Sequence, residues 1–176
     1  MASLVDDLMV ISSQGRAGHS MLQIALVRPQ QLAVQAAAFA RPRFEQRGLL
    51  LLVRADPDVP EIAADGTRIL RVLGNLLDNA AKFTERGGNV VLEVQEAASS
   101  VRFSVSNSGT PLRDEQRERL FQPFWQAGHE DRRGLGLGLS ICRSMVEAHG
   151  GTIWTESAPG MRLKVSFLLP RARALA

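Results

Sequence analysis

The 176-residue sequence predicts an α+β fold, a two-layer sandwich of helices against a sheet. Three observations lead to this prediction: strands and a helix open the chain, a pair of strands follows a long helix, and a second pair ends the chain. The pairs are expected at 89–97 with 101–106 and at 152–157 with 162–169. Because these last strands come as hairpins, a doubly wound parallel sheet is disfavoured.

The first third of the chain is predicted to hold two helices and two strands. Leu4, Leu8 and Ile11 repeat at helical spacing, which indicates a helix too short to be stable alone. The other elements expected are a strand at 21–27, a helix from Pro29 with Leu32, Ala36 and Phe39 on one face, and a strand at 49–55. Pro42 is expected to kink or end that helix, because proline lacks the N–H of an interior helical residue.

Two further helices are predicted in the rest of the chain. Asp65 is the expected N-cap of a helix that runs to about Phe83. Residues 107–133 are predicted to be mostly loop, and the glycines from Gly134 open a last helix that ends near His149. Since the carboxyl end of a helix favours positive charge, His149 is interpreted as a cation there.

Composition and charge exclude several classes of protein. Lys plus Arg number 21 against 18 Asp plus Glu, a net charge of +3 that is too small to predict nucleic-acid binding. The single cysteine, Cys142, excludes an internal disulfide framework and a multi-cysteine metal site. No apolar run approaches the ~18 residues of a membrane span, and no signal-peptide pattern opens the chain. We therefore expect a soluble cytoplasmic domain.

One stripe of the helix after Asp65 carries side chains that suit ligand binding. With 3.6 residues per turn, Asn75, Asn79 and Lys82 fall within roughly 60° of each other on this helix. Amide oxygens suit Mg²⁺, and an ammonium group is a point charge for phosphate. A solvated helix face is the plainer interpretation of this helix alone, although two asparagines in mid-helix need a reason.

Glycine and aromatic residues form three further candidate sites. Gly134, Gly136 and Gly138 precede the last helix, where backbone N–H groups favour an anion. Their spacing matches neither the dinucleotide fingerprint nor a P-loop, and a flexible connector is the alternative. Asn107 ends a predicted strand, where it could meet the edge of a base or form a simple turn. Residues 120–125 are an aromatic cluster that plain core packing could also explain.

The order and spacing of these motifs resemble the catalytic and ATP-binding domain of bacterial sensor histidine kinases, which has the Bergerat (GHKL) fold. Residues 75–84 resemble the N box, 107–111 the first glycine box, 121–124 the F box, 134–140 the second glycine box, and 150–170 the closing strands. The match spans about residues 20–170, and four motifs in the family's order make it specific.

This resemblance implies a mixed sheet covered by about three helices, with ATP and Mg²⁺ held between helices. Asn79 would ligate Mg²⁺, and the catalytic residues Asn75 and Lys82 would support and contact the phosphates. A mobile lid is implied at about 126–133, with Arg132 or Arg133 free to reach the γ-phosphate. The other nucleotide-binding residues implied are Asn107, Gly109, Phe124, Arg133, Gly134, Gly136, Gly138 and Leu139.

Two positions depart from the family pattern. The residue that reads adenine is usually Asp and is Asn107 here, so an amide oxygen would accept from adenine without the charge that strengthens such bonds. Losing that charge costs about 1 kcal/mol, or roughly fivefold in affinity. Pro111 replaces the second glycine of the same box and makes the loop stiffer.

The family's phosphoacceptor histidine has no counterpart in the chain. The histidines are His19, His129 and His149, and none lies in a Ser-His-Glu-Leu-Arg-type helix. Residues 1–18 are interpreted as the end of a dimerisation and phosphoacceptor helix, and 19–176 as the catalytic domain. We therefore expect a monomer that phosphorylates a histidine on a separate phosphoacceptor domain, with a response regulator downstream. The parent protein could be a membrane-bound sensor.

Two other functions stay open on the sequence alone. An ATP-driven clamp like that of DNA gyrase normally carries a catalytic Glu on the N-box helix, and no Glu lies between Asp65 and Thr84, although Asp78 needs a test. A pseudokinase, a protein-binding module with weak or no nucleotide binding, is supported by Asn107 and Pro111. The intact N box and the three glycines before the last helix oppose it.

Overall fold

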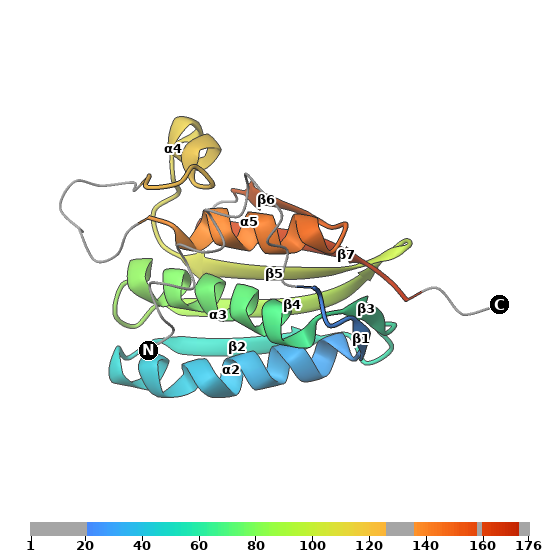
Figure 1. The fold of residues 1–176 in the computed structure, drawn as a ribbon. Helices are drawn as coiled ribbons and strands as arrows, with labels where there is room; N and C mark the ends of the chain where they lie inside the picture. Colours follow the sequence, from blue (N-terminus) through green and yellow to red (C-terminus); the bar gives the residue numbers. More distant parts are fainter. Residues whose placement is uncertain (1–20, 126–135, 158–159, 173–176) are drawn as a thin grey trace.

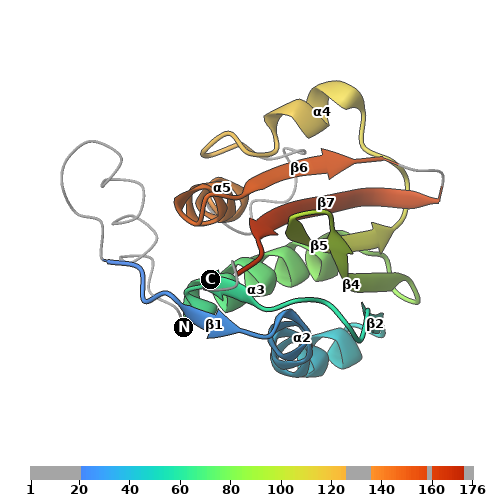
Figure 2. The ribbon, with the colours of Figure 1, turned by 90° about the vertical axis from the view of Figure 1, so that its right-hand side faces the viewer.

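Three helices cover one face of a five-stranded sheet (Figure 1 and Figure 2). The computed structural model describes residues 21–125, 136–157 and 160–172. The helices are α2 (Pro29–Gln46), α3 (Gly66–Phe83), α4 (Asp114–Arg119) and α5 (Gly138–Ala148). The strands are β1 (Ala25–Val27), β2 (Leu50–Ala55), β3 (Ile62–Ala64), β4 (Asn89–Ala97), β5 (Ser100–Ser108), β6 (Thr152–Glu156) and β7 (Met161–Pro170). The predicted α+β sandwich is confirmed.

The five-stranded sheet is mixed, with the order β2-β4-β5-β7-β6. β2 pairs with β4 in parallel, and α3 lies in the crossover between them, as parallel neighbours require. The other pairs are antiparallel, so both hairpins predicted from the sequence are confirmed. β1 and β3 form a separate two-stranded antiparallel sheet.

The core lies between the sheet and the layer of α2, α3 and α5. Strand residues alternate, so that Leu92, Phe103 and Phe167 point to the helices and are fully buried. The Phe103 and Phe167 rings stack across β5 and β7 with their centroids 4.8 Å apart. This packing fixes the helices that carry the candidate site.

Helix α2 differs from the prediction at two residues. Pro42 neither kinks nor ends it, because the helix continues to Gln46 and Phe44, 1% exposed, anchors its last turn in the core. The carbonyl that Pro42 leaves without a partner belongs to Ala38, on the exposed side of the helix, where water can bind it. Phe39 is 75% exposed and does not share the buried face with Leu32. The buried face instead continues from Leu32 through Ala36 and Ala40 to Phe44.

Two short elements lie where the sequence predicted turns and loops. α4 lies within the predicted loop 107–133, beyond the β6 edge of the sheet (Figure 2). Its first turn is closed by the Gln116 side chain, which accepts from the Arg113 N–H at 3.1 Å. β3 follows the turn-rich stretch 56–60 and is only three residues long. The helix predicted at 4–11 and the boundary at residue 18 lie outside the described residues.

No helix in the described ranges is both long enough and apolar enough to cross a bilayer. The longest helices, α2 and α3, each have one face buried against the sheet; the rest of α3 is mostly polar, whereas α2 also exposes Val34 and Phe39 among polar residues. This amphipathic pattern is that of a helix packed on a core.

Candidate functional site

Helix α3 holds the three ligand-type side chains of the N-box resemblance on one stripe. Its start is fixed by Asp65, whose Oδ1 accepts from the Arg68 N–H at 3.2 Å, as predicted for the N-cap. The fully apolar face packs into the core and comprises Ile69, Val72, Leu73, Leu76, Leu77, Ala80 and Ala81. Asn75, Asn79 and Lys82 lie beside that face and are half-buried, so they are ordered by packing yet reachable from outside.

Asn75 faces helix α5. Its carboxamide forms a hydrogen bond with the Cys142 thiol, and the thiol donates to the Val72 carbonyl at 3.8 Å. Burial raises the pKa of the Cys142 thiol to about 12, while the Asn75 hydrogen bond and the Arg71 charge lower it by less. Asn75 therefore joins α3 to α5 at the middle of both helices.

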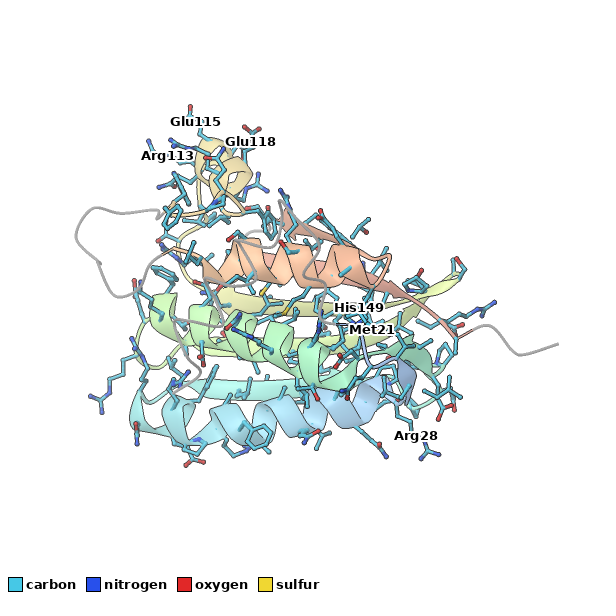
Figure 3. The ribbon with its side chains drawn as sticks, viewed as in Figure 1. Met21, Arg28, Arg113, Glu115, Glu118 and His149 are labelled. Atoms are coloured by element: carbon cyan, nitrogen blue, oxygen red, sulfur yellow. The ribbon has the colours of Figure 1, made fainter. Side chains whose placement is uncertain are left out.

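His149 joins the same two helices at their far ends (Figure 3). Its Nε2 accepts from the Asp65 N–H at 3.1 Å, and its Nδ1 lies 2.7 Å from the Met145 carbonyl oxygen. Since Nε2 accepts and a carbonyl can only accept, the ring is neutral with its proton on Nδ1. The interpretation of His149 as a cation is therefore wrong.

These contacts show that α3 and α5 run antiparallel, with the start of α5 beside the end of α3. The Asp65–His149 and Val72–Cys142 hydrogen bonds fix the direction of both helices. Gly138, the first residue of α5, consequently lies at the end of α3 that carries Asn79 and Lys82. The glycine motif and the N-box motif thus meet at one end of the helical layer.

Asn107 lies at the same end of the molecule, near the end of β5, and is 5% exposed. Its Nδ2 donates to Thr84 Oγ1 at 3.2 Å, and this hydroxyl donates to the Ala80 carbonyl at 2.6 Å. No described residue donates to its Oδ1. Sequence reasoning missed Thr84, although it directly follows Phe83 in the N-box motif.

Positive charge gathers around Phe83, beside Thr84. Lys82 Nζ lies 4.7 Å from the centroid of the Phe83 ring, and the Arg162 guanidinium carbon lies 5.6 Å from it. Gly109 packs against Arg162 with φ of +134°, and a Cβ there would come within 3.3 Å of the Arg162 Cβ. This corner therefore combines two cations with an aromatic ring and a buried amide, a combination that suits a nucleotide.

The F-box and second glycine motifs touch through their backbones. Phe124 has φ of +64°, rare for a large side chain, and its N–H donates to the Gly136 carbonyl at 3.0 Å. Gly136 also has a positive φ of +70°, and a Cβ there would lie 2.8 Å from the Trp125 carbonyl oxygen. Phe124 itself is 65% exposed. Arg132, Arg133, Gly134 and the predicted lid at 126–133 lie outside the described residues.

In the first turn of α5, the N–H groups of Gly138 and Leu139 donate to no described residue. Ile141 N–H donates to the Leu137 carbonyl, so the N–H groups of Gly138 and Leu139 precede the first helical hydrogen bond. The Leu139 side chain is buried in the core, which leaves its backbone to bind a ligand. Free N–H groups at a helix N-terminus suit phosphate oxygens.

Asn79 is the residue best suited to a metal ion. Among the described residues no cluster of three or more His, Cys, Asp or Glu side chains could hold a metal ion. The Asn79 side chain makes no hydrogen bond to a described residue, and its neighbour Asp78 forms an ion pair with Arg43 of α2. One amide oxygen fits Mg²⁺ that is otherwise held by phosphates and water. The Asp78 ion pair also counts against Asp78 as the base of an ATP-driven clamp.

Residues 64–173 match the family described as histidine kinase-, DNA gyrase B- and HSP90-like ATPases. This range is more than half of the chain, and the chain belongs to that family. Its relatives within the family are sensor histidine kinases, and its fold is that of their catalytic domains.

Three of these kinases illustrate the similarity. The alginate biosynthesis sensor protein KinB of Pseudomonas aeruginosa is 32% identical over 167 residues, which cover 95% of this chain and 28% of KinB. The catalytic domain of histidine kinase ThkA has a TM-score of 0.77 at 31% identity, covering 85% of this chain and 96% of that domain. Full-length ShkA in complex with AMPPNP has a TM-score of 0.84 at 32% identity, covering 98% of this chain and 36% of ShkA.

ThkA has also been solved with the response regulator protein TrrA, and that kinase chain has a TM-score of 0.79 at 28% identity, covering 96% of this chain and 47% of that one. The present chain spans less than half the length of the full-length kinases that it matches. The mixed sheet with three covering helices, which the resemblance implied, is confirmed.

Proposed function

We propose that this chain binds Mg-ATP and transfers the γ-phosphoryl group to a histidine on a separate phosphoacceptor domain, in two-component signal transduction. One observation carries the proposal: Asn79 and Lys82, the Asn107 amide and the N–H groups at the start of α5 lie at one end of the helical layer. They come from three elements that are far apart in sequence. Together they offer a metal ligand, a cation, a base acceptor and phosphate donors.

Each of these groups has a distinct part in the proposed reaction. Asn79 would hold Mg²⁺, which neutralises phosphate charge and orients the triphosphate. Lys82 and the N–H groups of Gly138 and Leu139 would bind phosphate oxygens, and Asn107 would accept from the adenine amine. The bond from the γ-phosphorus to the bridging oxygen breaks as the bond to the acceptor histidine nitrogen forms, and ADP leaves. Positioning and charge neutralisation supply most of the catalysis in such transfers.

The acceptor histidine is proposed to come from another segment or chain. Both ring nitrogens of His149 are engaged in hydrogen bonds inside the fold, so it is unsuited to accept a phosphoryl group. His19 and His129 lie outside the described residues. We accordingly propose a phosphoacceptor domain of the same kinase as the partner, a response regulator downstream, and a monomeric state for this chain. Because ATP is the substrate, the reaction is expected in the cytoplasm.

A calorimetric titration with a non-hydrolysable ATP analogue, with and without Mg²⁺, tests the proposal. We expect micromolar to submillimolar binding that tightens with Mg²⁺, and the Asn79→Ala variant should lose the Mg²⁺ effect because it removes the metal ligand. Asn89→Ala, which removes an amide at an exposed position at the start of β4, serves as the matched variant and should keep that effect.

Phosphotransfer is then measured by adding a histidine-containing phosphoacceptor domain and labelled ATP. The chain alone should incorporate no label. Absence of binding at millimolar nucleotide would favour the pseudokinase hypothesis, which Asn107 and Pro111 support. An unchanged Mg²⁺ effect in Asn79→Ala would contradict the metal assignment alone.

A further inference from the structure

An amide at position 107 raises a question of orientation that a carboxylate does not. The two oxygens of Asp are equivalent acceptors, whereas Asn carries an oxygen that accepts and a nitrogen that donates. If Asn107 meets a base, the end that faces it decides which base is bound. An amide oxygen matches the exocyclic amine of adenine, and an amide nitrogen matches the carbonyl of hypoxanthine or guanine.

The hydrogen bonds around Thr84 fix this orientation. The Ala80 carbonyl can only accept, and Thr84 Oγ1 lies 2.6 Å from it, so the single hydroxyl proton is donated there. Thr84 Oγ1 can then only accept from Asn107, 3.2 Å away, and the partner atom must be Nδ2. Thr84 and Asn107 are each 5% exposed, so water cannot easily replace either partner.

We propose that Thr84 determines the base specificity of the nucleotide site by holding the Asn107 carboxamide with its nitrogen inward and its oxygen free for the base. This inference rests on the proposed function. Oδ1 receives no hydrogen bond from a described residue, so it remains available to the amine of adenine. A base with a carbonyl at that position would set two acceptors against each other. Thr84 is a positioning residue that acts through Asn107 without touching the nucleotide.

Thr84→Val and Thr84→Ser form a matched pair for the test. Valine keeps the shape of threonine and removes the hydroxyl, so neither end of the amide finds a partner at position 84 and the bound base selects the orientation. Serine keeps the hydroxyl and its hydrogen bond to the Ala80 carbonyl. The probes are non-hydrolysable triphosphates of adenosine and inosine, titrated calorimetrically, because inosine has a carbonyl where adenosine has the amine.

We expect the unmodified chain to prefer the adenosine analogue, and Thr84→Val to lower the ratio of the two affinities by about tenfold. Thr84→Ser should retain the ratio of the unmodified chain. Thr84→Ala, which also lacks the hydroxyl, replaces Thr84→Val if that variant does not fold. The affinity ratio is read from folded protein, so a loss of stability by itself does not move it.

A double substitution separates action through Asn107 from direct contact with the base. In the Asn107→Asp background the side chain presents an oxygen in either orientation, so adding Thr84→Val should change the ratio by less than about twofold. An unchanged ratio in Thr84→Val alone, with adenosine binding intact, overturns the inference and leaves the proposed function standing. Absence of adenosine binding in the unmodified chain overturns the proposed function, and this inference with it.

Discussion

Cys142 links the acid–base behaviour of one side chain to the stability of the fold. Burial raises the pKa of its thiol from 9.0 to about 12, so above pH 9 the unfolded chain loses this proton while the folded protein retains it. The unfolded state then binds fewer protons, and the free energy of unfolding falls as the pH rises from about 9 towards 12. Urea denaturation on both sides of pH 9 measures the change.

The Cys142→Ala variant is the control for this pH dependence. It removes the titrating thiol and leaves every other group in place, so the loss of stability above pH 9 should be smaller in it than in the unmodified chain. Equal losses in the two proteins would show that the Cys142 thiol is not protected by burial between α3 and α5.

Asn107 is the residue whose charge differs from the family pattern, and restoring the acid should strengthen nucleotide binding. Asn107→Asp is expected to tighten ATP binding roughly fivefold, about 1 kcal/mol, because a charged acceptor binds the adenine amine more strongly. A charged carboxylate is a stronger acceptor than the Ala80 carbonyl, so in this variant the Thr84 hydroxyl donates to Asp instead, and the Ala80 carbonyl keeps the Thr84 N–H at 3.0 Å.

Asn89→Asp is the matched substitution for Asn107→Asp, measured in the same titration. It places the same charge at an exposed position at the start of β4, and its effect on affinity should be slight. If Asn107→Asp weakens ATP, the contact with adenine lies elsewhere in the site.

At the scale of elements, the hydrogen bond from Asp65 to His149 holds α5 against the first turn of α3. The amide of asparagine can reach the position of Nδ1, and the amide of the longer glutamine can reach the position of Nε2. Each variant therefore keeps one of the two hydrogen bonds of His149 and loses the other. His149→Asn leaves the Asp65 N–H without its acceptor and should lower the free energy of unfolding by about 1–2 kcal/mol. His149→Gln keeps an acceptor within reach and should lose less. Denaturant titration measures the free energy of unfolding of both variants, and a larger decrease in His149→Gln than in His149→Asn would contradict this account.

Between the F-box segment and α5, the contact depends on a glycine. Gly136→Ala adds a Cβ at a positive φ and against the Trp125 carbonyl, so it should cost about 1–3 kcal/mol of stability and weaken nucleotide binding. Gly138→Ala adds a Cβ with no atom within 4 Å and should leave stability nearly unchanged. Thermal unfolding compares the two, and equal destabilisation would mean that crowding at Gly136 is relieved elsewhere.

For the whole molecule, the elements predicted correctly are those with strong local signals. Asp65 caps α3 as its sequence position indicates, and the alternation of Val90, Leu92 and Val94 predicts the first hairpin. Pro42 misled the prediction because burial of Phe44 outweighs one lost hydrogen bond, and this burial depends on the sheet beneath α2. β3 and α4 are too short to carry a periodic pattern.

The site was predictable as a set of residue types but not as a set of contacts. Asn79 and Lys82 share a face because of helical periodicity, which the sequence contains. The pairs Thr84 with Asn107 and Asp65 with His149 are separated by 23 and 84 residues, and only the fold brings them together. The roles of Thr84 and His149 therefore follow from tertiary structure.

The hydrogen bond from Phe124 N–H to the Gly136 carbonyl also bears on how such chains can vary. It joins two residues that are twelve positions apart in the sequence. Because this hydrogen bond holds Phe124 and Gly136 together, residues inserted between them add little strain to α5 or to the sheet. Doubling the length of a loop raises the entropic cost of closing it by only about 0.6 kcal/mol. Natural relatives and engineered variants can accordingly differ in the length of this segment while the rest of the fold stays unaltered.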